Sequence, residues 1–127
     1  TRQDAITPIV EALGHPRLTL LKDSQEYTPE DGLTFNVLSV FDRDNWKKPS
    51  NSRNINVALY HGAIRGCQVG SGFHLDHGED DLSIFEDFDY AMLGDIHRIQ
   101  FLDLEQRVWY AGSTIQQNFG ESVEYSQ

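Results

Sequence analysis

Two short apolar runs, each closed by a glycine and a polar side chain, constrain the fold of this chain more than any other feature. Residues 55–60 (INVALY) are followed by a His-Gly pair, and residues 89–93 (DYAML) are followed by a Gly-Asp pair. Apolar runs of this length between turn residues are typical of buried strands. No apolar run in the chain approaches the roughly 18 residues that a membrane-spanning helix needs. The two runs therefore predict a sheet built from short, buried strands.

The remaining pattern predicts a mixed α/β domain with more strand than helix. A helix is expected over residues 4–13, because its apolar residues recur at i, i+3, i+4 and i+7 and Asp4 stands where it would cap the helix. The other predicted elements are strands at residues 18–21, 33–41, 100–104 and 107–111, a turn-rich loop at 23–32 and a short helical turn at 82–88. The strands at 100–104 and 107–111 are expected to form a hairpin.

The length and the charge of the chain limit the classes of function that it can have. The chain has 127 residues and a formal net charge of −10, and residues 61–127 carry three basic and twelve acidic side chains. Such a balance argues against a broad basic surface for nucleic acid, and it fits either a solvated acidic face or a cation site. The single cysteine, Cys67, favours a reducing compartment. Because the chain begins at Thr1 without a methionine, we expect that a preceding segment was removed.

Potential metal ligands follow both apolar runs. His61 follows the first run, and Asp95 and His97 follow the second. Ligand sites in open α/β sheets lie at the carboxyl ends of the strands, so these three side chains are expected to converge there, Asp95 and His97 on one side if their segment is extended. Imidazole and carboxylate together suit Mn²⁺, Fe²⁺ or Zn²⁺. Each residue also has an ordinary explanation, a histidine bonded to backbone or a carboxylate capping a turn, so both readings stay open.

A second group of ionisable residues lies in the glycine-rich stretch after the first run. His74 and His77 are three residues apart, and acidic side chains follow at positions 79, 80, 81, 86 and 87. Their geometry is not fixed by spacing in such a loop, so we expect a solvated, acidic face rather than a ligand set. Cys67 has no sequence neighbour that would make it a nucleophile.

Three segments together resemble the calcineurin-like metallophosphoesterases, and more narrowly the SbcD-type DNA repair and recombination nucleases, including phage recombination endonuclease subunits. The segments are residues 56–62 (NVALYHG), 88–98 (FDYAMLGDIHR) and 109–121 (WYAGSTIQQNFGE). In that family one strand ends in His-Gly, a later one ends in Gly-His-x-His, and a hairpin leads into Tyr-x-Gly-Ser and Phe-Gly-Glu. The resemblance is close over residues 55–121 and loose before them.

The resemblance implies the following fold and chemistry. The chain would be the C-terminal part of a four-layer α/β/β/α sandwich. His61 and Asp95 would ligate one ion of a two-metal site and His97 the other, with Mn²⁺ as the usual metal in the family. Two such ions lower the pKa of a bridging water and hold a phosphodiester for in-line attack. The partners implied are DNA, an SbcC-type SMC-like ATPase subunit and a second copy of the parent protein, in a bacterial or phage-infected cytoplasm and without a membrane.

Two departures from the family pattern limit what this chain can do alone. Asp95 stands where the family has the first histidine of Gly-His-x-His, and the family's Asp-x-His, bridging Asp and Asn-His motifs do not occur in residues 1–60. The cap domain is missing as well. We therefore expect residues 1–127 to form a partial domain that is inactive by itself. The alternatives are a non-catalytic binding or scaffold module and a different metallophosphoesterase, such as a phosphatase.

Overall fold

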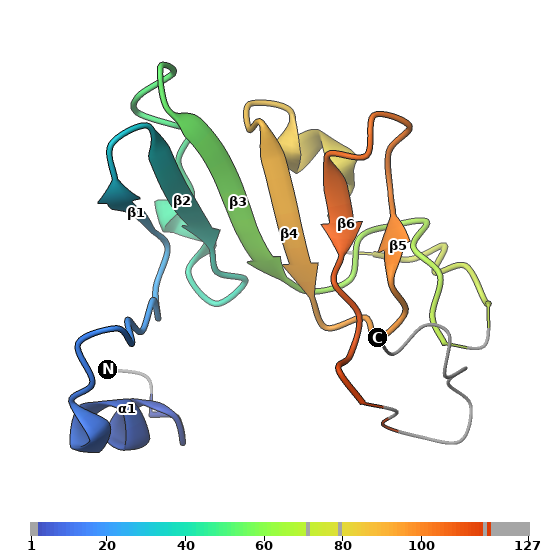
Figure 1. Cartoon of the computed structure of the whole chain (residues 1–127). Helices are drawn as coiled ribbons and strands as arrows, with labels where there is room; N and C mark the ends of the chain where they lie inside the picture. Colours follow the sequence, from blue (N-terminus) through green and yellow to red (C-terminus); the bar gives the residue numbers. More distant parts are fainter. Residues whose placement is uncertain (1–2, 71, 79, 116, 118–127) are drawn as a thin grey trace.

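Four parallel strands form the centre of a single six-stranded sheet in the computed structural model (Figure 1). The structure describes residues 3–70, 72–78, 80–115 and 117. Along the chain the elements are α1 (Thr7–Leu13), β1 (Gln25–Glu30), β2 (Leu33–Leu38), the 3₁₀ turn η1 (Arg43–Asn45), β3 (Ile55–His61), the 3₁₀ turn η2 (Leu82–Phe85), β4 (Tyr90–Gly94), β5 (Gln100–Phe101) and β6 (Val108–Tyr110). The strand order is β1-β2-β3-β4-β6-β5, with the edge strands β1 and β5 antiparallel to their neighbours. The expected strand-rich mixed α/β domain is confirmed.

The two apolar runs that define β3 and β4 lie side by side in the sheet. Val57 pairs with Tyr90 and His61 pairs with Gly94, so both strands end at the same edge. This edge carries the carboxyl ends of all four parallel strands, and α1 lies on the same side of the molecule (Figure 1). The segments that follow β3 and β4 therefore both start from this edge of the sheet.

One face of the sheet holds the hydrophobic core. Alternate residues of the strands point to this face, and they pack against η2 and the segment between β3 and β4. Its largest fully buried side chains are Tyr110, Ile64 and Cys67, and Phe85 of η2 is 3% exposed. Since all buried residues of the four parallel strands except Val57 point this way, this layer supplies most of the apolar burial that stabilises the domain.

The opposite face of the sheet is apolar but only partly covered. We call it the open face; it is formed by Phe35, Val37, Val57, Leu59, Tyr90, Met92, Phe101 and Trp109. Tyr90, Met92 and Phe101 are 44%, 41% and 54% exposed. Tyr90 and Phe101 both pack against Trp109, with ring centroids 6.5 and 6.2 Å from it. The sheet therefore has one complete layer beneath it and an apolar face without a second layer in the described residues.

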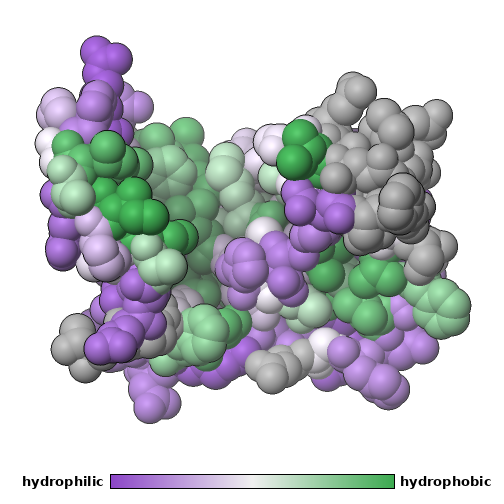
Figure 2. Space-filling model, turned by 90° about the horizontal axis from the view of Figure 1, so that it is seen from below, coloured by the Kyte–Doolittle hydropathy of each residue, from purple (hydrophilic) through white to green (hydrophobic). Residues whose placement is uncertain are grey.

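Helix α1 ends at Leu13 as the sequence predicts, but it begins at Thr7 rather than next to Asp4, and it buries none of its residues. Asp4 accepts hydrogen bonds from the backbone N–H groups of Ile6 and Thr7, at 2.9 and 2.7 Å, and Gly14 ends the helix with a φ of 53°. Ile6, Ile9 and Leu13 are 60%, 59% and 64% exposed. The apolar stripe of α1 is thus free of contacts that would bury it. Seen from below, hydrophobic surface on the α1 side continues into a hollow beside it (Figure 2).

Two expectations about the first third of the chain are wrong. Residues 18–21 do not form a strand, because they connect α1 to the sheet and pair with no strand there. Residues 23–32 do not form a loop, because most of them form β1, which pairs with β2. Pro29 lies within β1, where the register shifts between Tyr27 and Glu30. An edge strand tolerates this proline, since one side of it needs no ladder hydrogen bonds.

Candidate functional site

The imidazole of His61 lies directly over Gly94 at the carboxyl ends of β3 and β4. A Cβ atom on Gly94 would lie 2.9 Å from Cδ2 of His61, closer than such atoms approach. The backbone N–H of Gly62 donates to the carbonyl of Gly94 over 3.3 Å, so the link between the strands continues past the last residue of β3. Glycine at position 94 therefore makes room for the His61 ring.

Asp95 follows Gly94 in an unusual backbone conformation. Its φ is 93°, in the left-handed region that L side chains rarely adopt. β4 ends at Gly94, so the segment of Asp95 and His97 is not a regular strand and the two side chains need not share one side. The carbonyl of His97 accepts a hydrogen bond of 3.1 Å from the N–H of Ser113, which ties this turn to the segment after β6. Backbone strain of this kind is often found at functional sites.

Tyr110 of β6 fixes the backbone that follows His61. Its buried hydroxyl donates to the carbonyl of Gly62 at 2.6 Å and accepts from the N–H of Ile64 at 3.0 Å. Burial raises the pKa of Tyr110 far above its ordinary value, so the hydroxyl keeps its proton. Because both hydrogen bonds go to backbone groups, the role of Tyr110 is to hold the turn after β3 in place.

Asp80 is buried and paired, in contrast to the solvated acidic face expected for it. Its two oxygens accept from the Arg43 guanidinium at 2.8 and 2.9 Å, and the Tyr60 hydroxyl donates to it at 2.7 Å. The Arg43 hydrogen bond lowers the pKa of Asp80, while burial and the bond to Asp80 raise the pKa of Tyr60. Arg43 also lies 4.8 Å from the centre of the Trp46 ring. This network joins the β2–β3 connection, β3 and the loop before η2.

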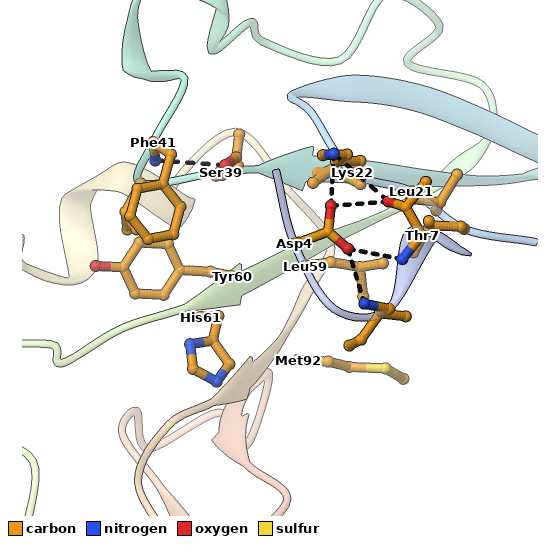
Figure 3. Close-up of a pocket in the computed structure, with 15 residues that line it drawn as sticks. Asp4, Thr7, Leu21, Lys22, Ser39, Phe41, Leu59, Tyr60, His61 and Met92 are labelled. Carbon is orange, nitrogen blue, oxygen red and sulfur yellow. Dashed lines mark hydrogen bonds and ion pairs between the residues drawn. The ribbon is translucent and has the colours of Figure 1, made fainter. Parts of the chain in front are cut away.

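A pocket of about 480 Å³ opens between α1 and the carboxyl ends of β2, β3 and β4 (Figure 3). His61 and Met92 lie on one side of it, and Asp4 and Lys22 on another. Lys22 bonds to the Asp4 carboxylate over 2.5 Å, and this bond lowers the pKa of Asp4. The rest of the lining is mainly apolar and includes Leu59 of the open face. The pocket thus joins the open face to the side chain of His61.

The structure brings His61 and Asp95 to neighbouring strand ends but does not complete a metal site. Within the described ranges, no three His, Cys, Asp or Glu side chains lie close enough together to hold a metal ion. His61, Asp95 and His97 are all exposed. Their chemistry suits a divalent cation, but their arrangement requires further ligands. We therefore derive no catalytic step from these residues alone.

The other ionisable side chains singled out in the sequence do not form a second site. Both ring nitrogens of His74 have partners, since Nδ1 lies 3.1 Å from the Gly66 carbonyl and Nε2 lies 2.9 Å from Nε2 of Gln68. Burial raises the pKa of the Cys67 thiol, which makes it a poorer nucleophile. Asp81 caps η2 by accepting from the N–H of Ser83 at 2.9 Å. Position 79 and residues 118–121 of the Phe-Gly-Glu motif lie outside the described residues.

Sequence reasoning missed the residues that hold the strand ends in place. Tyr110, Arg43 and Asp80 act through contacts between segments far apart in the chain, and no local pattern marks them. The Tyr-x-Gly-Ser motif includes Tyr110, but it gives no indication that the hydroxyl reaches the turn after β3.

No family model matches the chain. The chain is 34% identical over 133 residues to an uncharacterized protein of Acanthamoeba polyphaga mimivirus, and the match covers 96% of this chain and 10% of that protein. The chain therefore spans about a tenth of the length of the relative that it matches. Among the described residues no helix is both long and apolar enough to cross a membrane.

Proposed function

We propose that this chain supplies the C-terminal part of a metal-dependent nuclease core, and that the parent protein hydrolyses DNA phosphodiesters. His61, Asp95 and His97 would contribute donors to a two-metal site, and the bridging ligand would come from chain outside residues 1–127. Manganese suits the mixed imidazole and carboxylate donors. On this proposal the 127 residues alone are inactive, because the described side chains do not gather a complete ligand group.

The observation that carries the proposal is the position of His61 over Gly94 at adjacent strand ends, with Asp95 as the next residue along the chain. The His61 ring lies where any side chain at position 94 would collide with it, and Asp95 adopts a φ of 93° in the next position. A merely structural turn would accommodate Asn or Gly at position 95 with less strain. An exposed imidazole at one strand end and a carboxylate that follows the end of the neighbouring strand are donors of the kind expected in half a ligand set.

The open face supports the four-layer sandwich as the architecture of the parent. A sheet with both faces apolar is normally covered on both faces. Here the core face is covered, whereas Tyr90, Met92 and Phe101 of the open face are each more than two-fifths exposed. We propose that a second sheet packs on the open face and also fills the pocket beside His61. That sheet would carry the remaining metal ligands.

The proposed partners follow from the parent activity. DNA is the substrate, an SbcC-type ATPase subunit is the proposed partner, and a second copy of the parent is the proposed dimer mate. A non-catalytic scaffold module is the second candidate, favoured by the incomplete ligand group among the described residues. A phosphatase is less favoured, since the Tyr110–Ser113 part of the nuclease-type motif is engaged with both strand ends.

The test is a nuclease assay on the full-length parent protein with linear duplex DNA and Mn²⁺. Alanine at His61 or Asp95 is expected to lower the rate by about two orders of magnitude or more, as loss of a metal ligand does. The matched control is His77→Ala, because His77 is also an exposed histidine but lies in the loop before η2. This variant should retain the parental rate.

Three results would contradict the proposal. Mn²⁺-dependent cleavage by the 127-residue chain alone would show that no further ligands are needed. A parent that cleaves phosphopeptides but not DNA would be a phosphatase, and a parent inactive on both substrates would be a scaffold. Equal losses in the His61→Ala and His77→Ala variants would remove His61 from the site.

A further inference from the structure

Residues 4–22, which we call the arm, expose large apolar side chains. Figure 1 shows α1 apart from the strands, joined to β1 by a connection that lies in no strand. The large apolar residues of the arm that are between 38% and 64% exposed are Ile6, Ile9, Leu13, Leu18 and Leu20. Apolar surface gathered on one segment in this way is typical of a surface that another body covers.

The helix of the arm is too short to be stable without packing against another surface. α1 has seven residues and buries none of them. Isolated helices shorter than about 12–15 residues are marginal in water, and helices in proteins gain most of their stability by packing an apolar face. The hydrogen bond that Asp4 accepts from Thr7 caps α1 but buries no apolar side chain. The apolar stripe of α1 therefore requires a covering surface.

The segment after α1 has the character of a strand without a neighbour. Residues 18–21 (LTLL) are an apolar run of strand length, and residues 14–17 connect them to α1. Connections of about two to six residues commonly join a helix to a strand of the sheet on which the helix packs. The backbone groups of residues 19–21 form no hydrogen bond with any residue that the structure describes. This run can therefore pair with the edge of another sheet.

Space for a further layer lies between the arm and the open face. The pocket of about 480 Å³ is lined by Thr7 of α1, by Leu20 and Leu21 of the arm, and by Leu59 and Met92 of the open face (Figure 3). A body that enters this pocket thus contacts α1, the apolar run and the sheet together. Because the arm and the open face both present apolar side chains to it, a layer inserted there would bury apolar surface on both of its sides.

We infer that the arm is this chain's own contribution to the second sheet. Residues 18–21 add to that sheet as an edge strand, and α1 covers its outer face. The occupant of the space is thus a sheet of the parent protein that has a free strand edge and two apolar faces. The inference rests on the proposed function for the existence of that sheet, but it does not require nuclease activity. The mimivirus relative is long enough to supply such a sheet, because this chain spans about a tenth of its length.

The test is hydrogen–deuterium exchange of the full-length parent protein, measured by mass spectrometry of its peptides. After correction for intrinsic rates, we expect the amides of residues 18–21 to exchange about a hundredfold more slowly than those of Leu104 and Glu105 in the β5–β6 turn, because strand pairing protects amides. Ile9→Asp places a charge on the apolar stripe of α1 and should speed exchange at residues 18–21 about tenfold.

Two features of the design separate the covering layer from the helix itself. Ile9 lies in the first turn of α1, where the helix dipole favours an acidic side chain, so Ile9→Asp does not disfavour the helix. The matched control is Leu104→Asp, because Leu104 is also an apolar residue and is fully exposed in the β5–β6 turn. This variant should leave exchange at residues 18–21 unchanged.

Three results would overturn the inference. The first is exchange at residues 18–21 as fast as at Leu104, and the second is an equal effect of Ile9→Asp and Leu104→Asp. The third is slow exchange in the 127-residue chain alone that depends on its concentration, because a second copy would then cover the arm. A nuclease assay on the same parent samples separates the two proposals. DNA cleavage with fast exchange at residues 18–21 contradicts only this inference, whereas slow exchange there without cleavage contradicts only the nuclease activity.

Discussion

The buried network around Asp80 gives the sharpest prediction about stability. Replacement of Asp80 by Asn keeps the shape of the side chain but removes its charge and one acceptor oxygen. In the native protein Asp80 is 9% exposed and accepts from Arg43 at 2.8 and 2.9 Å and from Tyr60 at 2.7 Å. With a single acceptor oxygen left, at least one of these donors loses its partner.

The magnitude follows from the number of bonds lost and from the exposure of the partner. A hydrogen bond to a charged group contributes about 1.5–3 kcal/mol. The Arg43 side chain is 37% exposed, so water partly replaces its lost bond and the upper end of that range is not reached. We expect Asp80→Asn to lower the free energy of unfolding by about 2 kcal/mol. Urea unfolding monitored by Trp fluorescence measures this as a lower midpoint with an unchanged m-value.

The dependence on pH gives an independent check of the same reasoning. The Arg43 hydrogen bond lowers the pKa of folded Asp80 below the ordinary value of 3.8. A carboxyl with a lowered folded pKa stabilises the protein above its unfolded pKa, and this contribution is lost as the pH falls through the folded pKa. The difference between the native protein and Asp80→Asn should therefore be constant near neutral pH and shrink below about pH 3.8.

The control is Asp87→Asn, which removes the exposed partner of Lys48 and should leave the urea midpoint unchanged. The reasoning is refuted if Asp80→Asn and Asp87→Asn have equal midpoints. It is also refuted if the effect of Asp80→Asn is the same at pH 3 as at neutral pH.

Three further predictions concern the strand ends and the core. Tyr110→Phe removes a hydroxyl that bridges two backbone groups, so it should lower the free energy of unfolding by about 1–3 kcal/mol and speed hydrogen exchange at the Ile64 amide. An unchanged exchange rate would argue against the bridge. Cys67 is fully buried and burial raises its pKa, so the thiol should react with a disulfide reagent at mildly alkaline pH only after denaturant is added. Gly94→Ala places a Cβ 2.9 Å from the His61 ring and should shift the His61 imidazole resonances, and an unshifted ring would mean that the two do not touch.

The sequence predicted the part of the site that depends on local patterns. The apolar runs that became β3 and β4 are bounded by glycine and polar residues, and continuous apolar runs of this kind are typical of strands buried on both faces. From those two strands it followed that His61 and Asp95 would come after strands that end at one sheet edge, and the register confirms that β3 and β4 end together. Local sequence patterns likewise predicted helix α1 and the β5–β6 hairpin.

What the sequence alone determined, then, is where β3 and β4 lie and where they stop, because hydrophobic period and glycine act over a few residues. Only the tertiary structure decided which polar residues are buried and what they contact. β1 is a strand because β2 lies beside it, and Asp80 is buried because Arg43 and Tyr60, 37 and 20 residues away, supply its hydrogen bonds. The unpartnered oxygen of Asn36 and the uncovered open face are likewise properties of packing between distant segments, and no local pattern in the chain encodes them.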